Sequence, residues 1–470
     1  MIYIVMTGIL LILLLFLDSK RTNEFVYNRE QSEDQMVDTI QYYIENNVKK
    51  IGAKGISISL VNDKKTIMKK EYGVTTSENE QYVLGSVSKS FTALCIMQLV
   101  EQDKIKLDKS IGEYLREDKE YNERMELITV RELLNHTSGI GVNALTINKK
   151  IQMKQDGFKY SNLNYNLLGK IIEKVSGLPY SDYVEKNIFE PLKMQYSVAN
   201  LSMANTKGYQ NYFGFIIKKQ NNKKNRYRWI KEPSGYLVST LNDMILYMQM
   251  YLNGGILQGK SIINEESLNK IFSFEVDATN DEVSGGMLSG KAYYNMGWIC
   301  KNVNGEKIYY HSGKVKNFNS MMVLFPKRNY GLVILSNTGD FLVGTNLFEK
   351  MSEGIVKIIL GKSVQNISPI RFKVSHILLD WVMIVVTSLF LMNLTNIYEY
   401  GYGLMGSNLF FNLILYILIV GVFISSLFSK KISLCEILDF VPSIWWLINI
   451  NCFIMVISCI LIVMKYISCF

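Results

Sequence analysis

The chain has 470 residues, of which 48% are hydrophobic and 20% charged, and its formal net charge is +9. This length suffices for one large globular domain together with membrane segments. The basic charge would suit nucleic acid, an anionic membrane surface or an anionic wall polymer, but no nucleic-acid-binding motif occurs, so nucleic acid is not an expected partner. Only three histidines occur, and the six cysteines lack disulfide or zinc spacing, so neither a metal nor a cofactor is expected.

The first predicted element is an apolar helix near the N-terminus. Residues Ile2–Leu17 are almost entirely apolar, and Asp18, Ser19, Lys20 and Arg21 follow them. A secretory signal peptide would need a basic stretch before the apolar run and small residues at a cleavage site, and neither is present. We therefore predict an uncleaved signal-anchor over residues 1–22 in preference to a removed signal peptide.

Residues 30–365 carry the alternating patterns of a mixed α/β domain. Helices are expected at Gln31–Lys50, Phe91–Val100 and Gly344–Leu360, and strands at Ile56–Val61, Thr66–Tyr72, Lys307–His311, Ser320–Phe325 and Tyr330–Ser336. The middle of this domain reads as largely helical. Because strands occur near both ends, we predict one sheet in which the two ends of the domain meet. The densest basic run, Lys218 to Lys231, is interpreted as a solvated hairpin or loop in preference to a site for an anionic partner.

Three long apolar stretches follow the domain, within residues 374–470. They cover His376–Leu394, Leu409–Phe428 and Val441–Met464. Each approaches or exceeds the roughly 20 residues that a helix needs to cross a bilayer. Buried core helices are the alternative, which the near absence of charge disfavours. Asp380 is the exception, and an acid inside a span usually faces protein or water.

The orientation of the chain in the membrane follows less directly from charge. Lys20, Arg21, Arg371 and Lys373 flank the domain, and the positive-inside rule alone would keep it in the cytoplasm. That rule applies poorly to long translocated domains. The chemistry described below favours an extracytoplasmic domain, which leaves the two indications in conflict.

The first motif that carries chemistry is Gly85-Ser86-Val87-Ser88-Lys89, before the predicted buried helix. Residues three apart share one face of a helix, so Ser86 and Lys89 would point into the same space. A partly desolvated lysine can take the proton of a serine hydroxyl, and the helix N-terminus supplies N–H groups for an oxyanion. Alone, this spacing also fits an ordinary capped helix.

Two further motifs follow along the chain. In Tyr160-Ser161-Asn162, a tyrosine beside a lysine can shuttle protons, and the asparagine can bind both that lysine and a substrate amide. In His311-Ser312-Gly313-Lys314, the glycine would let a substrate approach the strand, and the Lys314 N–H could complete an oxyanion hole with that of Ser86. A helix-capping loop and a lone strand-end histidine are the respective alternatives.

Together, the three motifs resemble the active-site set of the penicillin-recognising serine hydrolases, in particular the class C β-lactamase branch with its D,D-peptidases, D-aminopeptidases and esterases. Further segments also resemble that branch, namely Leu133–Gly139, Phe189–Met194, Pro233–Asp243 and Tyr294–Trp298. The resemblance covers residues 30–360. It implies a β-lactamase/transpeptidase-like α/β fold with an antiparallel sheet and a helical subdomain.

The resemblance also implies roles for individual residues. Ser86 would be acylated, Lys89 and Tyr160 would share the proton transfers, and Asn162 would orient the substrate amide. His311 stands where β-lactamases commonly have lysine, which weakens the case for a dedicated β-lactamase. Lys314 replaces a small residue, so a narrower or more basic groove is expected. His136 is expected to be structural.

The predicted function is that of a membrane-anchored, extracytoplasmic, multi-pass serine hydrolase that works through an acyl-enzyme. A peptidase or amidase on D-amino-acid-containing or N-acylated peptides ranks above an esterase on wall polymers, and both rank above a β-lactamase. The layout resembles that of prodrug-activating peptidases of nonribosomal peptide pathways, which implies the bilayer and an exporter as partners. A sensor that is acylated without turnover is the alternative of another class.

Overall fold

The structure is a computed structural model. It describes residues 2–19, 24–25, 32–75, 79–141, 144–146, 157–212, 215–220, 230–281, 287–340 and 343–378, together with residues 381 and 388. The predicted stretches 409–428 and 441–464, Asp380 and most of the basic run lie outside these residues. Within the described ranges, no helix combines the length and the apolar character that a membrane span requires.

An eight-stranded antiparallel sheet forms the centre of the domain, in the order β10-β11-β12-β13-β14-β15-β2-β3. Its strands pair in the register Ile56↔Ser336 where β15 meets β2, so the two ends of the domain lie side by side, as predicted. The strands are β2 Gly55–Val61, β3 Thr66–Gly73, β10 Val276–Asp277, β11 Ala292–Asn295, β12 Trp298–Val303, β13 Glu306–Val315, β14 Phe318–Phe325 and β15 Tyr330–Ser336.

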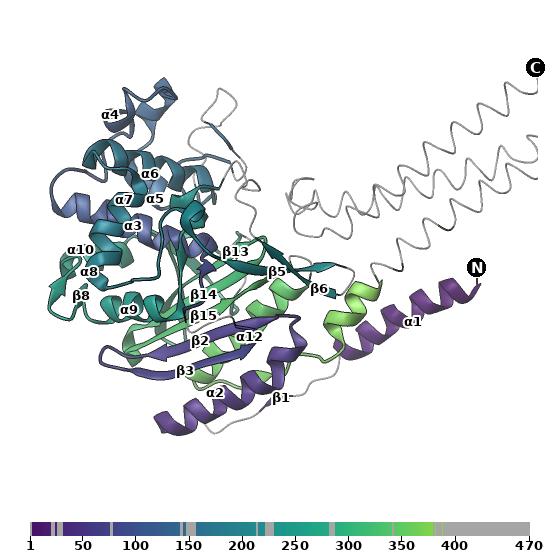
Figure 1. Cartoon of the computed structure of the whole chain (residues 1–470). Helices are drawn as coiled ribbons and strands as arrows, with labels where there is room; N and C mark the ends of the chain where they lie inside the picture. The colour runs from purple at the N-terminus through teal and green to yellow at the C-terminus, as the bar shows by residue number, and fades with distance from the viewer. Residues whose placement is uncertain are drawn as a thin grey trace, which may run out of the picture.

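Helices cover both faces of this sheet (Figure 1). On one face, α2 (Glu33–Asn47) and α12 (Gly344–Ile359) pack together over a core that receives Ile56 and Ile58 of β2. On the other face, α9 (Leu241–Leu252) packs on β15 and β2. Every residue of β2 is buried, because a central strand covered on both sides has no solvent face.

The helical region beyond α9 surrounds α3 (Ser88–Glu101). Residues Ser88–Leu99 of α3 are all buried, as the apolar sequence predicts. Around α3 lie α6 and α7, while α4 and α5 pack on α6. These helices and the last ones are α4 Gly112–Leu115, α5 Val130–Leu134, α6 Asn162–Ser176, α7 Tyr180–Val184, α8 Glu190–Leu192 and α10 Glu265–Ser273; α1 spans Ile2–Ser19.

Short turns and small sheets connect these layers. The short helical turns are η1 Val48–Lys50, η2 Gly85–Val87, η3 Glu123–Leu127, η4 Glu185–Phe189, η5 Leu201–Met203, η6 Glu232–Tyr236 and η7 Pro326–Arg328. The paired short strands are β1 Glu24–Phe25 with β17 Val364–Gln365, β4 Tyr82–Val83 with β7 Val238–Ser239, and β8 Ile256–Leu257 with β9 Lys260–Ser261. A three-stranded sheet joins β16 (Thr338–Gly339), β5 (Lys207–Tyr212) and β6 (Phe215–Gln220).

Candidate active site

Ser86 and Lys89 lie at the start of the buried helix. Ser86 is in the turn η2, and Lys89 is the second residue of α3, so the chain passes from strand β4 through one tight turn into the helix. The Nζ atom of Lys89 lies 3.1 Å from the Oγ atom of Ser86. Ser86 is partly exposed while Lys89 is completely buried, so a substrate can reach the hydroxyl but not the amine.

Three oxygen atoms surround the Lys89 amine. Besides Ser86 Oγ, these are Oδ1 of Asn162 at 2.8 Å and the backbone carbonyl of Ser234 at 2.6 Å. Both carbonyl oxygens only accept hydrogen bonds, so they take two N–H bonds of the amine. The third position of the amine therefore points at Ser86 Oγ. When Lys89 is neutral, this position is its lone pair, placed to receive the serine proton.

The surroundings of Lys89 favour the neutral amine. Burial lowers the pKa of Lys89 well below its ordinary value, because removing an ammonium from water disfavours the charged form. Among the described residues, no carboxylate forms an ion pair with this amine, and its hydrogen-bond acceptors are uncharged. The geometry and the electrostatics therefore both suit a general base.

Tyr160 lies directly before α6 and faces the same amine. The Lys89 ammonium position is 4.9 Å from the centre of the Tyr160 ring. Burial raises the pKa of Tyr160 above its ordinary value, and the neighbouring Ser86 hydroxyl partly offsets that rise. The buried Tyr160 hydroxyl has no hydrogen bond of good geometry among the described residues. It thus stays protonated at neutral pH and is available to carry a proton to or from a substrate.

His311 is on β13, in a section of that strand with one unpaired edge. The pairing of β12 with β13 ends at Ile299↔Tyr310, whereas β14 pairs with β13 as far as Val315. The turn η2 contacts β13. Strand β13 therefore brings the predicted residues His311, Ser312, Gly313 and Lys314 to the edge where Ser86 lies.

The His311 imidazole is neutral and has one ring nitrogen without a hydrogen. Its Nδ1 atom lies 2.7 Å from the carbonyl oxygen of Ser312, and since a carbonyl only accepts, Nδ1 carries the proton. Nε2 is buried and has no partner among the described residues. Burial, with a smaller effect from Lys89, lowers the pKa of His311 to about 3. His311 can therefore accept a hydrogen bond but offers no positive charge at neutral pH.

Two glycines allow η2 and β13 to touch. A Cβ atom added to Gly85, which has φ +54°, would lie 2.6 Å from the backbone nitrogen of Lys314. A Cβ atom on Gly313 would lie 1.9 Å from the carbonyl oxygen of Leu84. The sequence-based interpretation of Gly313 as room for a substrate is therefore incomplete, because the residue is first required by the contact with Leu84. Gly85 directly precedes Ser86, so the Ser86 backbone lies close to that of Lys314, and the oxyanion hole formed by their N–H groups stays a prediction.

The side chain of Lys314 forms an ion pair with α12. Its Nζ atom lies 2.8 Å from a carboxylate oxygen of Glu349 on α12. The Glu349 carboxylate therefore offsets the charge of this lysine, and the expected narrower or more basic groove stays a prediction.

His136 supports Tyr160 from behind. Its Nδ1 atom accepts hydrogen bonds from the backbone N–H of Ser161 at 3.2 Å and from the side-chain amide of Asn164 at 3.0 Å. The ring packs 4.4 Å from the Tyr160 ring, centre to centre. The geometry fits the structural role predicted for His136. In that role, the histidine fixes the backbone beside Tyr160.

The Ser234 carbonyl is a site group that sequence reasoning missed. The preceding carbonyl, of Pro233, accepts a hydrogen bond of 2.7 Å from Thr92 of α3. This bond ties the turn η6 to the helix that carries Lys89. A backbone carbonyl leaves no mark on residue type, so only the Pro-Ser-Gly sequence at 233–235 could have indicated an irregular turn here. No cluster of side chains able to hold a metal ion occurs among the described residues.

Comparison with known proteins agrees with this arrangement. A sequence model described as Beta-lactamase matches residues 40–345, a range that contains all the predicted site residues. The chain belongs to the β-lactamase family. The eight-stranded antiparallel sheet with its helical region is accordingly a β-lactamase/transpeptidase-like fold.

The individual relatives of this β-lactamase-family protein are distant. Protein flp of Staphylococcus aureus (strain MW2) is 28% identical over 352 residues, which cover 68% of this chain and 66% of that protein. The chain thus spans just under two thirds of the length of the curated relative. The octameric penicillin-binding protein homologue from Pyrococcus abyssi has a TM-score of 0.57 at 26% identity, over 69% of this chain and 78% of that chain. A D-amino acid amidase from Ochrobactrum anthropi, complexed with D-phenylalanine, has a TM-score of 0.56 at 19% identity, over 69% and 98% of the two chains.

Proposed function

We propose that this protein is a peptidase or amidase that cleaves D-amino-acid-containing or N-acylated peptides through an acyl-enzyme on Ser86. The observation that carries the proposal is the Lys89 amine, which is buried among neutral acceptors and directed at Ser86 Oγ. The likeness in fold to a D-amino acid amidase supports the substrate class.

The reaction would proceed in two halves. Ser86 Oγ forms a bond to the substrate carbonyl carbon while its proton passes to Lys89, and the N–H groups of Ser86 and Lys314 hold the oxyanion. The C–N bond then breaks, and the proton reaches the leaving amine through Tyr160. In the second half, the oxygen of a water molecule bonds to the acyl carbon, the ester bond between that carbon and Ser86 Oγ breaks, and the water proton returns to Ser86 Oγ as the acid product leaves. Proton transfer of this kind typically contributes about 10²–10⁴ in rate.

The neutral His311 favours an amide over a β-lactam as the substrate. β-Lactams carry a carboxylate, and so do peptides that are bound at their C-terminus. A cation at this position would bind that carboxylate. His311 has a pKa of about 3 and Lys314 is paired with Glu349, so neither supplies an unpaired positive charge. A substrate with an uncharged group here avoids burying an unpaired carboxylate. We accordingly rank a peptidase or amidase above an esterase, and both above a β-lactamase.

We also propose that the domain is held at the extracytoplasmic face of a cell membrane. The apolar stretches in residues 374–470 and the exposed apolar side chains of α1 support this anchoring. The combined layout would suit a prodrug-activating peptidase that acts beside an exporter, or a peptidase of the cell wall.

Intact-mass spectrometry tests the proposed function. Detergent-purified protein and Ser86→Ala are incubated separately with a fluorescent penicillin, an N-acyl-D-asparagine amide and a simple ester. We expect turnover of the amide and a Ser86-dependent acyl adduct. Faster turnover of the ester or the penicillin would replace the proposed substrate class. A stable adduct without turnover of any compound would favour a sensor.

A further inference from the structure

The β5–β6 hairpin exposes a strongly apolar tip. Phe215, the first residue of β6, is 74% exposed, and Ile217 on the same strand is 50% exposed. Residues two apart in a strand point to the same face, so these side chains form one apolar edge beside the turn. Large apolar side chains exposed together commonly mark a contact with a membrane or another protein.

A buried polar cluster close to the turn of this hairpin joins the hairpin to the helix at 371–378. The side-chain amide of Asn211 on β5 lies 2.7 Å from Nε2 of His376 and 3.0 Å from a carboxylate oxygen of Asp340. The same His376 atom lies 2.7 Å from Asp340. All three side chains are buried. The hairpin is therefore held in a fixed position relative to the helix that leads toward the C-terminal apolar stretches.

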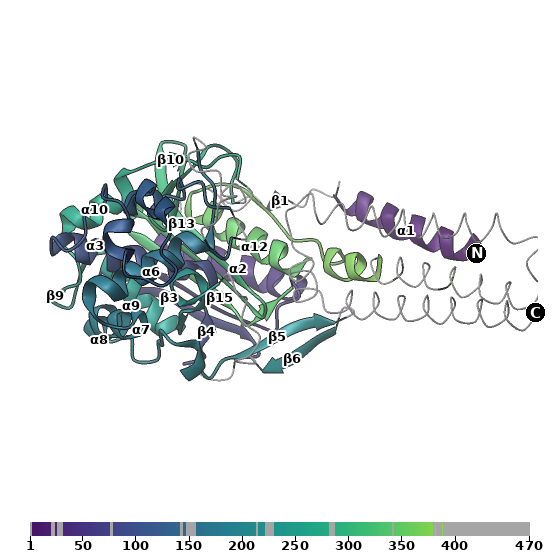
Figure 2. The same ribbon diagram turned by 90° about the horizontal axis from the view of Figure 1, so that it is seen from above.

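Other apolar side chains are exposed at the same end of the molecule. Both views show the hairpin extending toward the side where α1 and the helix at 371–378 lie (Figures 1 and 2). Gly8 of α1 packs against the ring of Trp381, which leaves no room for a Cβ atom, so α1 lies beside this part of the chain. Ile377 is exposed, and so are seven large side chains of α1: Ile9, Leu10, Ile12, Leu13, Leu14, Phe16 and Leu17.

Positive charges accompany this apolar end. Lys218 follows Ile217 on β6, and Arg371 and Lys373 lie on the helix at 371–378, all three exposed. Apolar tips with lysine or arginine directly behind them match the boundary of a bilayer, where apolar groups enter the acyl region and cations meet anionic headgroups. The long basic side chains can reach the headgroups while their stems remain on apolar surface.

We propose that the tip of the β5–β6 hairpin, carried by Phe215 and Ile217, inserts into the interface of an anionic lipid bilayer and sets the orientation of the catalytic domain on it. The inference rests on the membrane anchoring proposed above. A lipid surface fits better than a second copy of the chain or a protein partner, because the apolar edge is flanked by cations and extends toward the end of the molecule where α1 lies. The buried Asn211–His376–Asp340 cluster connects the hairpin to the catalytic domain, because Asp340 directly follows β16 and β16 follows β15 of the eight-stranded sheet along the chain.

Photocrosslinking in vesicles tests this inference. The full chain with Phe215→p-benzoylphenylalanine is reconstituted into vesicles of phosphatidylglycerol and phosphatidylethanolamine, irradiated and analysed by intact mass. The matched control is Ile256→p-benzoylphenylalanine, because Ile256 is 46% exposed and lies on β8, at the opposite end of the molecule (Figure 1). Ser86 acylation by a soluble substrate verifies that both variants are folded.

We expect phospholipid adducts at position 215, none above background at position 256, and a lower yield when phosphatidylcholine replaces phosphatidylglycerol. Equal lipid adducts at the two positions, or none at position 215, would overturn the proposal. A crosslinked dimer at position 215 would assign the apolar edge to a second copy and would also overturn it. Flotation of the chain with the vesicles is measured separately. If the chain does not float, the membrane anchoring on which this proposal rests is wrong, and this result is independent of whether the protein hydrolyses the substrate.

Discussion

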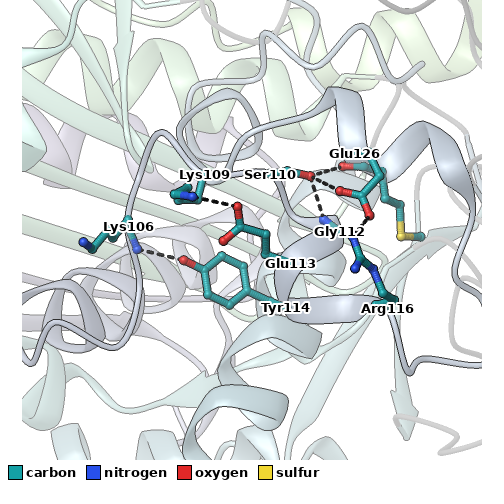
Figure 3. A network of polar contacts seen from close by, with 9 residues as sticks. Lys106, Lys109, Ser110, Gly112, Glu113, Tyr114, Arg116 and Glu126 are labelled. Carbon is teal, nitrogen blue, oxygen red and sulfur yellow. Dashed lines mark hydrogen bonds and ion pairs between the residues drawn. The ribbon is translucent and has the colours of Figure 1, made fainter.

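In two regions of the molecule, the basic side chains have opposite kinds of partner and opposite pKa shifts. In the surface network around α4 and η3 (Figure 3), Lys109 lies 3.0 Å from Glu113, and Arg116 lies 2.7 Å from Glu126. The Glu113 carboxylate raises the pKa of Lys109. In the active site, Lys89 has only uncharged partners and its pKa is lowered. A lysine side chain is therefore suited to act as a base where burial is combined with uncharged hydrogen-bond acceptors.

Replacing the buried lysine should have the largest effect. For Lys89→Met we expect the acylation rate to fall about 10²–10⁴-fold, because Ser86 loses its base, while the free energy of unfolding stays unchanged or rises by about 1 kcal/mol, since a poorly solvated amine is removed. The measurements are acyl-adduct formation and urea unfolding. The matched variant Lys109→Met should leave acylation unchanged. Equal losses in both variants would contradict the contrast between the two regions.

Adding a carboxylate should make Lys89 resemble the surface cations. Asn162→Asp places a negative charge about where Oδ1 accepts from Nζ, which should raise the pKa of Lys89 and lower the acylation rate at neutral pH about 10- to 100-fold. Because the change acts on protonation, the rate should recover as pH rises. Asn122→Asp, at the N-cap of η3 in the surface region, serves as the control. A rate loss that does not recover at high pH would indicate lost substrate binding instead.

The contact beneath the nucleophile can be compared with an open glycine position. Gly85→Ala places a residue with a Cβ atom at φ +54°, where side chains are strained, and it forces the Lys314 backbone to shift. Gly177, at φ +74°, has open space around it, so Gly177→Ala should cost only the conformational penalty of about 1–2 kcal/mol. Gly85→Ala should cost more and should also slow acylation. Thermal unfolding and adduct formation measure the two effects, and similar values for both variants would show that the η2–β13 contact is loose.

The smallest expected effect is that of His311→Gln on the pH dependence of acylation. A group with a lowered lysine pKa is the active free base above that pKa, so acylation should fall as pH falls through a midpoint well below 10.5. His311, with a pKa of about 3, stays neutral above pH 5, and burial lowers the pKa of His136 as well. We therefore expect neither histidine to produce a step near pH 6.5, and His311→Gln should leave the shape of the profile unchanged. A step near pH 6.5 that disappears in this variant would show that His311 titrates in the reaction.

Sequence patterns predicted the regular parts of the fold. The expected helix at Gln31–Lys50 matches α2 and η1, where Ser32 and Gln35 form a capping box, and the expected strand Ile56–Val61 matches β2. Strand β13 extends to Val315, four residues beyond its predicted end, because His311-Ser312-Gly313-Lys314 is polar or small. Strand β5 was missed for a similar reason, since Lys207–Tyr212 lacks alternating apolar residues.

Some features of the candidate site could be predicted from local sequence and others could not. The spacing of Ser86 and Lys89 on a helix predicted their proximity, because both belong to one local element. The Ser234 carbonyl and the Lys314–Glu349 ion pair depend on chain segments that meet only through the tertiary fold. Backbone acceptors and side-chain directions of this kind have no local signature, so sequence spacing could not reveal them.

The pairing of β2 with β15 has a consequence for how the chain folds during its synthesis. Ile56 is made early and Ser336 late, so β2 waits without one of its neighbours until nearly the whole domain has been synthesised. Contacts between residues so far apart in sequence form slowly, and an unpaired apolar strand is exposed to aggregation in the meantime. Gly313, which holds η2 in place, also comes late. In a newly made chain, Ser86 would therefore be present long before the site around it is complete.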